Sequence, residues 1–212
     1  MFSPRFLAAT VVGTLAASAA YAHPHVFVTA GAGFLTAPSG DLAAVQVTWT
    51  YDAFTSLTFF EILDLDQDGD GVLDAADLAR LVEAQTIWPD DFVGDTYLEH
   101  GASPVALGRP EAGRSWMSDG RISVSFELPL ETPLEPTSDV VLRLYDPTYY
   151  IAYSTTSLDV TPDGCEAEII PFQSASASDA LQAQLSQLSR DETPQSNDVG
   201  RVFADRVRLT CG

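Results

Sequence analysis

The most specific chemical signal in the sequence is an acidic loop that runs from Asp66 to Asp77. It fits the twelve-residue EF-hand loop, in which positions one, three, five, seven, nine and twelve face a calcium ion. In this chain those positions are Asp66, Asp68, Asp70, Val72 through its backbone carbonyl, Asp74 and Asp77. Gly71 stands at position six, where the loop turns sharply. Because calcium prefers hard oxygen donors, we expect calcium as a cofactor at this loop.

Position twelve departs from the usual pattern, since Asp77 stands where a bidentate glutamate is usual. A shorter side chain must draw the following helix closer or bind through one oxygen. We therefore expect weak binding, in the ~10⁻⁴–10⁻³ M class of extracellular modules. The alternative is a solvated acidic turn without metal. Calcium sensors usually pair two such loops, and this sequence has one. The single loop therefore favours a structural ion, which holds its own segment in place, and disfavours calcium sensing.

A second candidate metal site is the pair of histidines in His23-Pro24-His25. Alternate residues of a strand point to the same side, so both imidazoles can face one ion, and His100 can complete the set. Imidazole suits Zn, Cu and Ni, so the residues do not select the metal. Pro24 has no N–H to lose, which excludes the square-planar amino-terminal Cu(II)/Ni(II) mode. The alternative is a polar leader into the first strand.

The first 22 residues read as a secretory signal peptide and not as part of the fold. Arg5 is followed by an uncharged stretch, Phe6 to Ala22, which ends in the small-x-small site Ala20-Tyr21-Ala22. The alternative is an uncleaved membrane anchor; no later segment approaches the ~20 apolar residues of a spanning helix. Cleavage after Ala22 would export the protein. In an oxidising compartment we expect a disulfide between Cys165 and Cys211, the alternative being two thiols that bind a soft metal.

The composition excludes several functions. The ten basic residues are all arginine, against thirty acidic residues, and the formal charge is −20. Without lysine there is no Walker-type phosphate lysine and no Schiff base. So acidic a chain is also unsuited to nucleic acid, whose binders need a basic face, and it attracts cations instead. The hydrophobic content of 46% predicts a packed core.

The elements that must position these residues are mostly strands, and we expect one β-rich domain over residues 23–212. The predicted fold is α+β, an antiparallel, sandwich-like β core with a late amphipathic helix and an EF-hand-like helix–loop–helix insert at about 53–86. The predicted helices are 53–63, 75–84 and 176–190. The predicted strands are 25–29 and 42–50, which form a hairpin, 121–128, 140–145, 149–153, 165–170 and 199–209.

Several of these segments together resemble one bacterial family. They are Ala22-His23-Pro24-His25-Val26-Phe27, Val47-Thr48-Trp49-Thr50-Tyr51-Asp52 before a helix, the single calcium-type loop, Leu144-Tyr145-Asp146-Pro147-Thr148-Tyr149-Tyr150, and the late cysteine pair. The family is a domain of unknown function labelled as the periplasmic component of an uncharacterised ABC-type transport system. Its members are often encoded beside nickel/cobalt permeases. The resemblance implies a periplasmic protein linked to transition-metal transport, with His23 and His25 as the family's N-terminal His-x-His.

Three functions follow from these readings. The leading one is a binding protein, not an enzyme, that captures or delivers a divalent transition metal (Ni, Co, Zn or Cu) for an inner-membrane permease. The second is a calcium-dependent interaction module, because the loop followed by Asp77-Leu78 and Leu81 is similar to one dockerin repeat. The third is a copper enzyme that uses the amine and imidazole of His23. The sequence has no Gly-x-Ser-x-Gly elbow and only three histidines, which disfavours hydrolytic triads.

Overall fold

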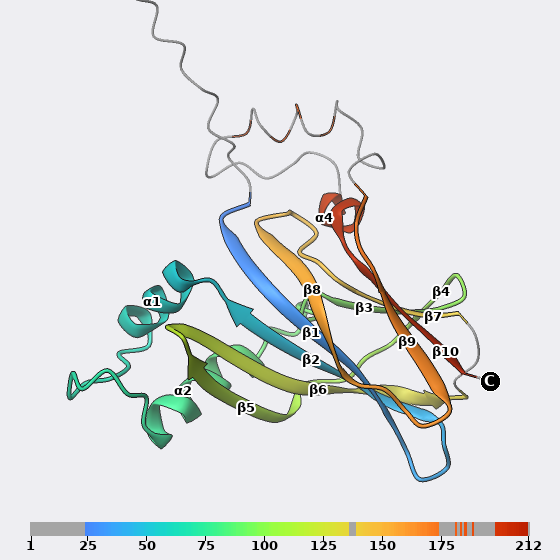
Figure 1. Cartoon of the computed structure of the whole chain (residues 1–212), viewed down its shortest axis with the longest axis horizontal. Helices are drawn as coiled ribbons and strands as arrows, with labels where there is room; N and C mark the ends of the chain where they lie inside the picture. Colours follow the sequence, from blue (N-terminus) through green and yellow to red (C-terminus); the bar gives the residue numbers. More distant parts are fainter. Residues whose placement is uncertain are drawn as a thin grey trace, which may run out of the picture.

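A computed structural model describes residues 24–135, 139–173 and 198–211, together with positions 181, 183, 185 and 188. The chain is mostly β, and its described strands form two five-stranded sheets that share one hydrophobic core (Figure 1). The expected β core is therefore confirmed. The proposed signal peptide and His23 lie outside the described residues, as does most of the predicted helix 176–190; of that helix, positions 181, 183 and 185 are described and are helical.

The two sheets have the same number of strands, but the strands of the first sheet are longer. The first has the order β5-β6-β2-β1-β8. Its strands are β1 (Val26–Thr36), β2 (Leu42–Tyr51), β5 (Glu111–Ser118), β6 (Arg121–Leu134) and β8 (Ile151–Val160). The second has the order β4-β3-β7-β10-β9. Its strands are β3 (Thr96–His100), β4 (Ser103–Val105), β7 (Val140–Leu144), β9 (Cys165–Ile170) and β10 (Arg206–Cys211).

The predicted hairpin is present, but its first strand is longer than expected. β1 pairs antiparallel with β2 from Val28 opposite Tyr51 to Thr36 opposite Leu42. The predicted strand ended at residue 29, and the Ala/Gly run that follows it has low strand propensity. The small residues are explained by what lies over them: a Cβ added to Gly31 would stand 2.4 Å from Oδ2 of Asp159. The run is therefore a strand that another side chain covers closely.

One strand pair corrects the purely antiparallel expectation. β8 pairs with β1 in parallel, from Val26 opposite Ile151 onward. The backbone N–H groups of His25 and Val26 both donate to the carbonyl of Tyr150, at 2.8 and 3.3 Å. The two strands therefore begin at the same point and run in the same direction. β8 also begins later than the predicted strand 149–153, because Tyr149 adopts a left-handed conformation, with φ 58°.

The core is built by the alternation that the sequence displays. On β6, Ile122, Val124, Phe126 and Leu128 are each at most 1% exposed, as their common face predicted. They join Phe34 and Val47 of the same sheet and a set of aliphatic side chains from the second sheet: Leu98, Leu142, Leu144, Val207 and Leu209. Burying this apolar surface is the main stabilising contribution to the fold.

Two helices lie together at one end of the first sheet. They are α1 (Ala53–Ile62) and α2 (Ala75–Thr86), close to the predicted bounds (Figure 1). Asp52 caps α1, because its Oδ1 accepts the N–H of Thr55 at 2.9 Å. The loop between the helices contains the acidic segment. α2 packs on the edge strand β5, so the helical pair covers one edge of the sheet.

The end of the chain differs from the prediction of one strand over 199–209. Residues Val199–Phe203 form the short helix α4, and only Arg206–Cys211 form a strand, β10. Gly200 allows this helix to lie close to the preceding chain, since a Cβ there would stand 1.9 Å from the carbonyl oxygen of Asp146. The helix thus packs directly on the backbone that follows β7. Strands β3, β4 and β5 were not anticipated from the sequence.

Candidate functional site

Three aspartates of the acidic loop converge at one point. Asp66, Asp68 and Asp70 each offer a carboxylate oxygen, and these oxygens lie within 4.8 Å of one another. Among the described residues this is the one cluster of three potential metal ligands. No ion pair of the described part of the chain involves these carboxylates. Their charges face one another unpaired, an arrangement that favours a cation.

The backbone of the loop holds this arrangement in place. Oδ1 of Asp66 accepts the N–H groups of Asp70 and Gly71 at 3.0 and 3.2 Å, and Oδ1 of Asp70 accepts that of Val72 at 2.8 Å. Gly71 has φ 80°, in the left-handed region that glycine enters freely. Position six of the motif thus makes the turn expected of it. The residues present fit a calcium ion in donor type and spacing.

Asp74 and Asp77, at positions nine and twelve of the loop, cap α2 and do not join the cluster of three aspartates. Asp74 is the N-cap of α2, and its Oδ1 accepts the N–H groups of Ala76 and Asp77 at 2.7 and 2.9 Å. Asp77 completes a capping box through Oδ2, which accepts the N–H of Asp74 at 3.1 Å. Its Oδ1 lies 2.5 Å from Nη2 of Arg80. The structure therefore gives both oxygens of Asp77 protein partners and leaves it outside the convergent cluster.

The helical pair is joined to the first sheet by polar contacts on both sides of the loop. The N–H of Ile122 on β6 donates to Oγ of the buried Ser56 on α1, at 2.9 Å. Ser115 on β5 donates to the carbonyl of Leu78 on α2, at 2.8 Å. Leu81 of α2 is fully buried in the core. The loop therefore connects two helices that are each hydrogen-bonded to the β5–β6 hairpin.

The structure does not bring the described histidines together. His25 precedes β1, where its ring lies 4.8 Å from the ring of Tyr150. That tyrosine ends the turn that follows β7. His100 closes β3 and pairs with Val140, the first residue of β7. The two histidines thus lie toward opposite ends of β7, and His100 does not complete a set with His25.

The expected disulfide is present. Cys165 and Cys211 are bonded, with their Cα atoms 4.1 Å apart, at opposite positions of the β9–β10 ladder. It joins the start of β9 to the last strand of the chain. Neither cysteine is therefore a thiolate ligand, and the soft-metal alternative is wrong.

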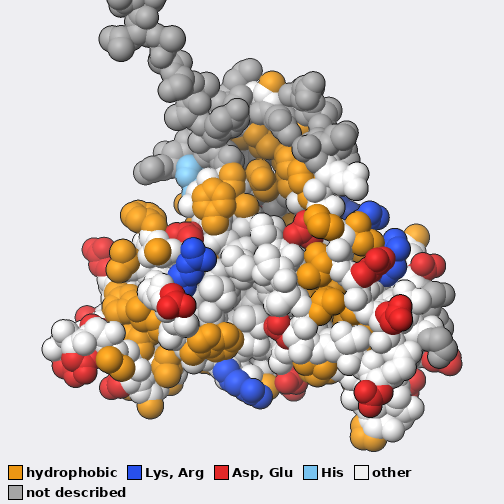
Figure 2. Space-filling model, viewed as in Figure 1, with side chains coloured by type: hydrophobic (Ala, Val, Ile, Leu, Met, Phe, Trp, Pro, Cys, Tyr) orange, Lys and Arg blue, Asp and Glu red, His pale blue; other side chains and the backbone are white. Residues whose placement is uncertain are grey.

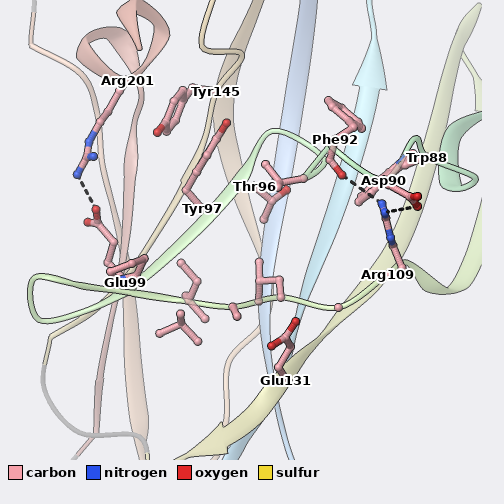
Figure 3. Close-up of a pocket in the computed structure, with 17 residues that line it drawn as sticks. Trp88, Asp90, Phe92, Thr96, Tyr97, Glu99, Arg109, Glu131, Tyr145 and Arg201 are labelled. Atoms are coloured by element: carbon pink, nitrogen blue, oxygen red, sulfur yellow. Dashed lines mark hydrogen bonds and ion pairs between the residues drawn. The ribbon is translucent and has the colours of Figure 1, made fainter. Parts of the chain in front are cut away.

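A pocket of about 530 Å³ that the sequence reading missed lies along β3. The rings of Tyr97 and Tyr145 stack in it at 4.0 Å, with Glu99 and Arg201 paired at 2.5 Å at one end (Figure 3). At the other end Arg109 donates to the carbonyls of Pro89 and Phe92 at 3.0 and 3.2 Å. Both arginines are thus already paired, and the pocket offers neither as an unpaired cation.

A buried carboxylate lies next to this pocket. Asp95 is 5% exposed, and its Oδ2 accepts a 2.8 Å hydrogen bond from the hydroxyl of Tyr153 on β8. Burial raises the pKa of Asp95 to about 7, a rise that the Tyr153 hydrogen bond opposes and the charge of Asp146 reinforces. Asp95 stands in no motif, so its type and position gave no sequence signal.

Comparison with known proteins places the chain in a family without assigning it an activity. No helix among the described residues is long and apolar enough to cross a membrane. An uncharacterized protein of Haemophilus influenzae is 23% identical over 208 residues, which cover 90% of this chain and 91% of the relative. The model of one family matches residues 8–211, nearly the whole chain. The chain therefore belongs to the family described as "Protein of unknown function (DUF1007)".

Proposed function

We propose that this chain is an exported metal-binding protein in which a calcium ion closes the loop between α1 and α2. The observation that supports it most is the convergence of the Asp66, Asp68 and Asp70 carboxylates within 4.8 Å. The ion would be held by these three side chains, by the carbonyl of Val72 and by water. Asp77 would act as the cap of α2 and not as a ligand, because both of its oxygens are engaged.

The role of this ion would be structural. Three aspartates at close range repel one another, and a divalent cation removes that repulsion. The loop is one of the links between α1 and α2, which are each bonded to the β5–β6 hairpin. Calcium would therefore hold the EF-hand-like insert against the β core. The disulfide supports the exported location, because such bonds persist in oxidising compartments.

The test is calorimetric titration of metal-free protein with Ca²⁺, and with Mg²⁺ for comparison. We expect one equivalent of calcium to bind and the melting temperature to rise. The variant Asp66→Asn/Asp70→Asn should lose both effects. Asp90→Asn/Asp91→Asn, which removes two exposed carboxylates elsewhere, is the matched control and should retain them. Equal calcium-induced shifts in wild type and the loop variant would refute the site.

The proposal extends to a transition ion captured at the mature N-terminus for a partner permease. The specific support is His25, whose backbone N–H donates to Tyr150 at 2.8 Å and whose ring lies against that tyrosine. In the sequence, His25 follows the predicted cleavage site by two intervening residues. Titration with Ni(II), Co(II), Zn(II) and Cu(II) should show binding that His25→Ala abolishes and His100→Ala retains. The copper-enzyme alternative would instead show oxygen consumption with a reductant.

A further inference from the structure

A groove of about 420 Å³ lies between the acidic loop and the β5–β6 hairpin, and we call it the loop groove. Val72, Leu73 and Leu78 line it from the loop and α2, and Trp116 and Met117 line it from β5. Val72 is 64% exposed, Trp116 40% and Met117 37%. The groove therefore presents large apolar side chains to solvent beside the candidate calcium site.

The residue types of the loop groove are those of protein interfaces. Tryptophan and methionine are enriched there, and tryptophan is among the residues that most often dominate binding energy. Methionine also adapts to partners of different shape, because its side chain is flexible and polarisable. Trp116 stands on the edge strand β5, where its exposed ring is not needed for the core. An apolar side chain from a partner would fill the groove.

The charge around the groove indicates what such a partner carries. Residues 53–86 contain eight acidic side chains and a single basic one, Arg80, which is paired with Asp77. Asp119 adds a further carboxylate to the groove itself. Figure 2 shows hydrophobic and acidic side chains side by side over this end of the molecule. Arg114 and Arg121 of the β5–β6 hairpin add two positive charges. The nine carboxylates still outnumber these arginines and Arg80, so the surface remains negative with one calcium bound. It therefore repels anionic lipid and attracts a basic segment.

The groove and the ion cluster share one stretch of backbone. Asp70 belongs to the cluster and accepts the N–H of Val72, which lines the groove, at 2.8 Å. Ordering the carboxylates around an ion therefore fixes the position of Val72 opposite Trp116. We propose that the loop groove docks an apolar, basic segment of a partner protein and that calcium in the loop strengthens this docking. The calcium dependence rests on the metal site proposed above.

The probe for this test is a synthetic amphipathic helix of leucine and lysine, labelled for fluorescence anisotropy. It is titrated with the folded protein in calcium and in chelator. A helix with glutamate in place of lysine, and anionic and neutral phospholipid vesicles, are titrated in parallel. The groove variant is Val72→Ser/Trp116→Thr, with Met117→Arg as a second variant that adds repulsion without removing the tryptophan. The matched control is Phe54→Ser/Leu57→Ser, two exposed apolar residues of α1, at 78% and 66%.

We expect the lysine helix to bind in calcium, and the glutamate helix and the vesicles not to bind. Both groove variants should weaken binding by about tenfold or more, the scale of a truncated interface hot spot, and the α1 variant should leave it unchanged. The docking site is refuted, while the metal site stands, if calcium binds but the lysine helix does not. The same holds if the lysine helix binds the groove variants as tightly as the wild type. Equal weakening by the α1 variant, or binding to anionic vesicles, would also refute it. If calcium itself does not bind, the metal site is refuted, and with it the calcium dependence of docking. Peptide binding that the groove variants weaken would still support the docking site.

Discussion

The hydroxyl of Tyr153 on β8 donates a 2.8 Å hydrogen bond to the carboxylate of Asp95, which precedes β3. The bond joins the two sheets through a side chain that is almost fully removed from water. Charged carboxylates are rarely buried without a cationic partner, because desolvation disfavours the ionised form. This relationship gives the fold a defined dependence on pH.

We predict that Asp95→Asn stabilises the protein above neutral pH. The pKa of Asp95 is raised to about 7 when folded, from about 3.9 in an unfolded chain. Between these values the folded state holds a proton that the unfolded state releases, so stability falls as pH rises. At pH 8 the shift of about 3 units corresponds to at most roughly 4 kcal/mol. Asparagine also suits the backbone, whose φ is 49°.

The measurement for this prediction is chemical denaturation of wild type and Asp95→Asn from pH 5 to pH 8.5. The difference in unfolding free energy should grow with pH and level off above the folded-state pKa. The exposed Asp91 supplies the control Asp91→Asn, which should show no such growth. A gap between Asp95→Asn and wild type that does not change with pH would contradict the assignment.

The second prediction concerns the disulfide. Reducing Cys165–Cys211, which closes a span of 46 residues, should lower stability by ~4 kcal/mol in the chain-entropy model. The loss should appear as a lower melting temperature with reductant, and the Cys165→Ser/Cys211→Ser variant should reproduce it without reductant. Non-reducing peptide mass spectrometry of protein from an oxidising compartment should contain the linked peptide. Two alkylatable thiols in that preparation would disprove the bond.

The third prediction concerns the contact that attaches α1 to the sheet. Ser56 is 1% exposed, and its hydroxyl accepts the backbone N–H of Ile122. Ser56→Ala removes this acceptor and leaves a buried N–H without a partner, which costs about 1–3 kcal/mol. Calorimetric melting of the variant should show this loss. Thr58→Ala, on the same helix but with its hydroxyl bonded to the carbonyl of Phe54 within α1, should cost less.

Much of this fold could be predicted, because its signals are local. The alternation over 121–128 specified one buried face, and all four of its apolar residues are in the core. Asp52 and Asp74 start the two helices that the spacing predicted. The cysteine pairing followed from the predicted compartment. The buried face and the helix starts depend on neighbouring residues. The disulfide follows from the rule that cysteines pair in an oxidising compartment, which needs no knowledge of the topology.

The features that were missed depend on contacts distant in sequence. In β1, Gly31 lies close beneath Asp159, and Gly33 lies close beneath Val160, both far along the chain. Gly200 allows α4 to pack against the backbone of Asp146, a contact that the local sequence does not indicate. Asp95 is a buried acid because it lies at the start of β3 against Tyr153 of β8. No sequence motif indicates this contact. The sequence could not show that His25 and His100 lie apart, because this depends on the strand register. His100 pairs with the first residue of β7, and His25 lies beyond its other end.

The last prediction separates the two roles that Asp77 can have. The sequence places it at position twelve of the predicted calcium loop, but the structure shows it in the capping box of α2 and 2.5 Å from Arg80. Burial would raise its pKa, but the backbone N–H of Asp74, the guanidinium of Arg80 and the backbone N–H of Asp66 together hold that pKa below its ordinary value. The folded state thus stabilises the charged carboxylate without any metal.

Asp77→Ala should therefore lower the melting temperature of metal-free protein, because α2 loses its capping box and Arg80 loses its partner. Asp68→Ala should leave the metal-free melting temperature unchanged or slightly raised, since it relieves repulsion within the cluster, and should abolish the calcium-induced rise. Both variants are melted in chelator and in excess calcium. A cap contributes in both conditions, so the deficit of Asp77→Ala should persist in both. If that deficit is absent in chelator and appears only with calcium, Asp77 is a ligand, and the loop rearranges on binding to release it from the cap.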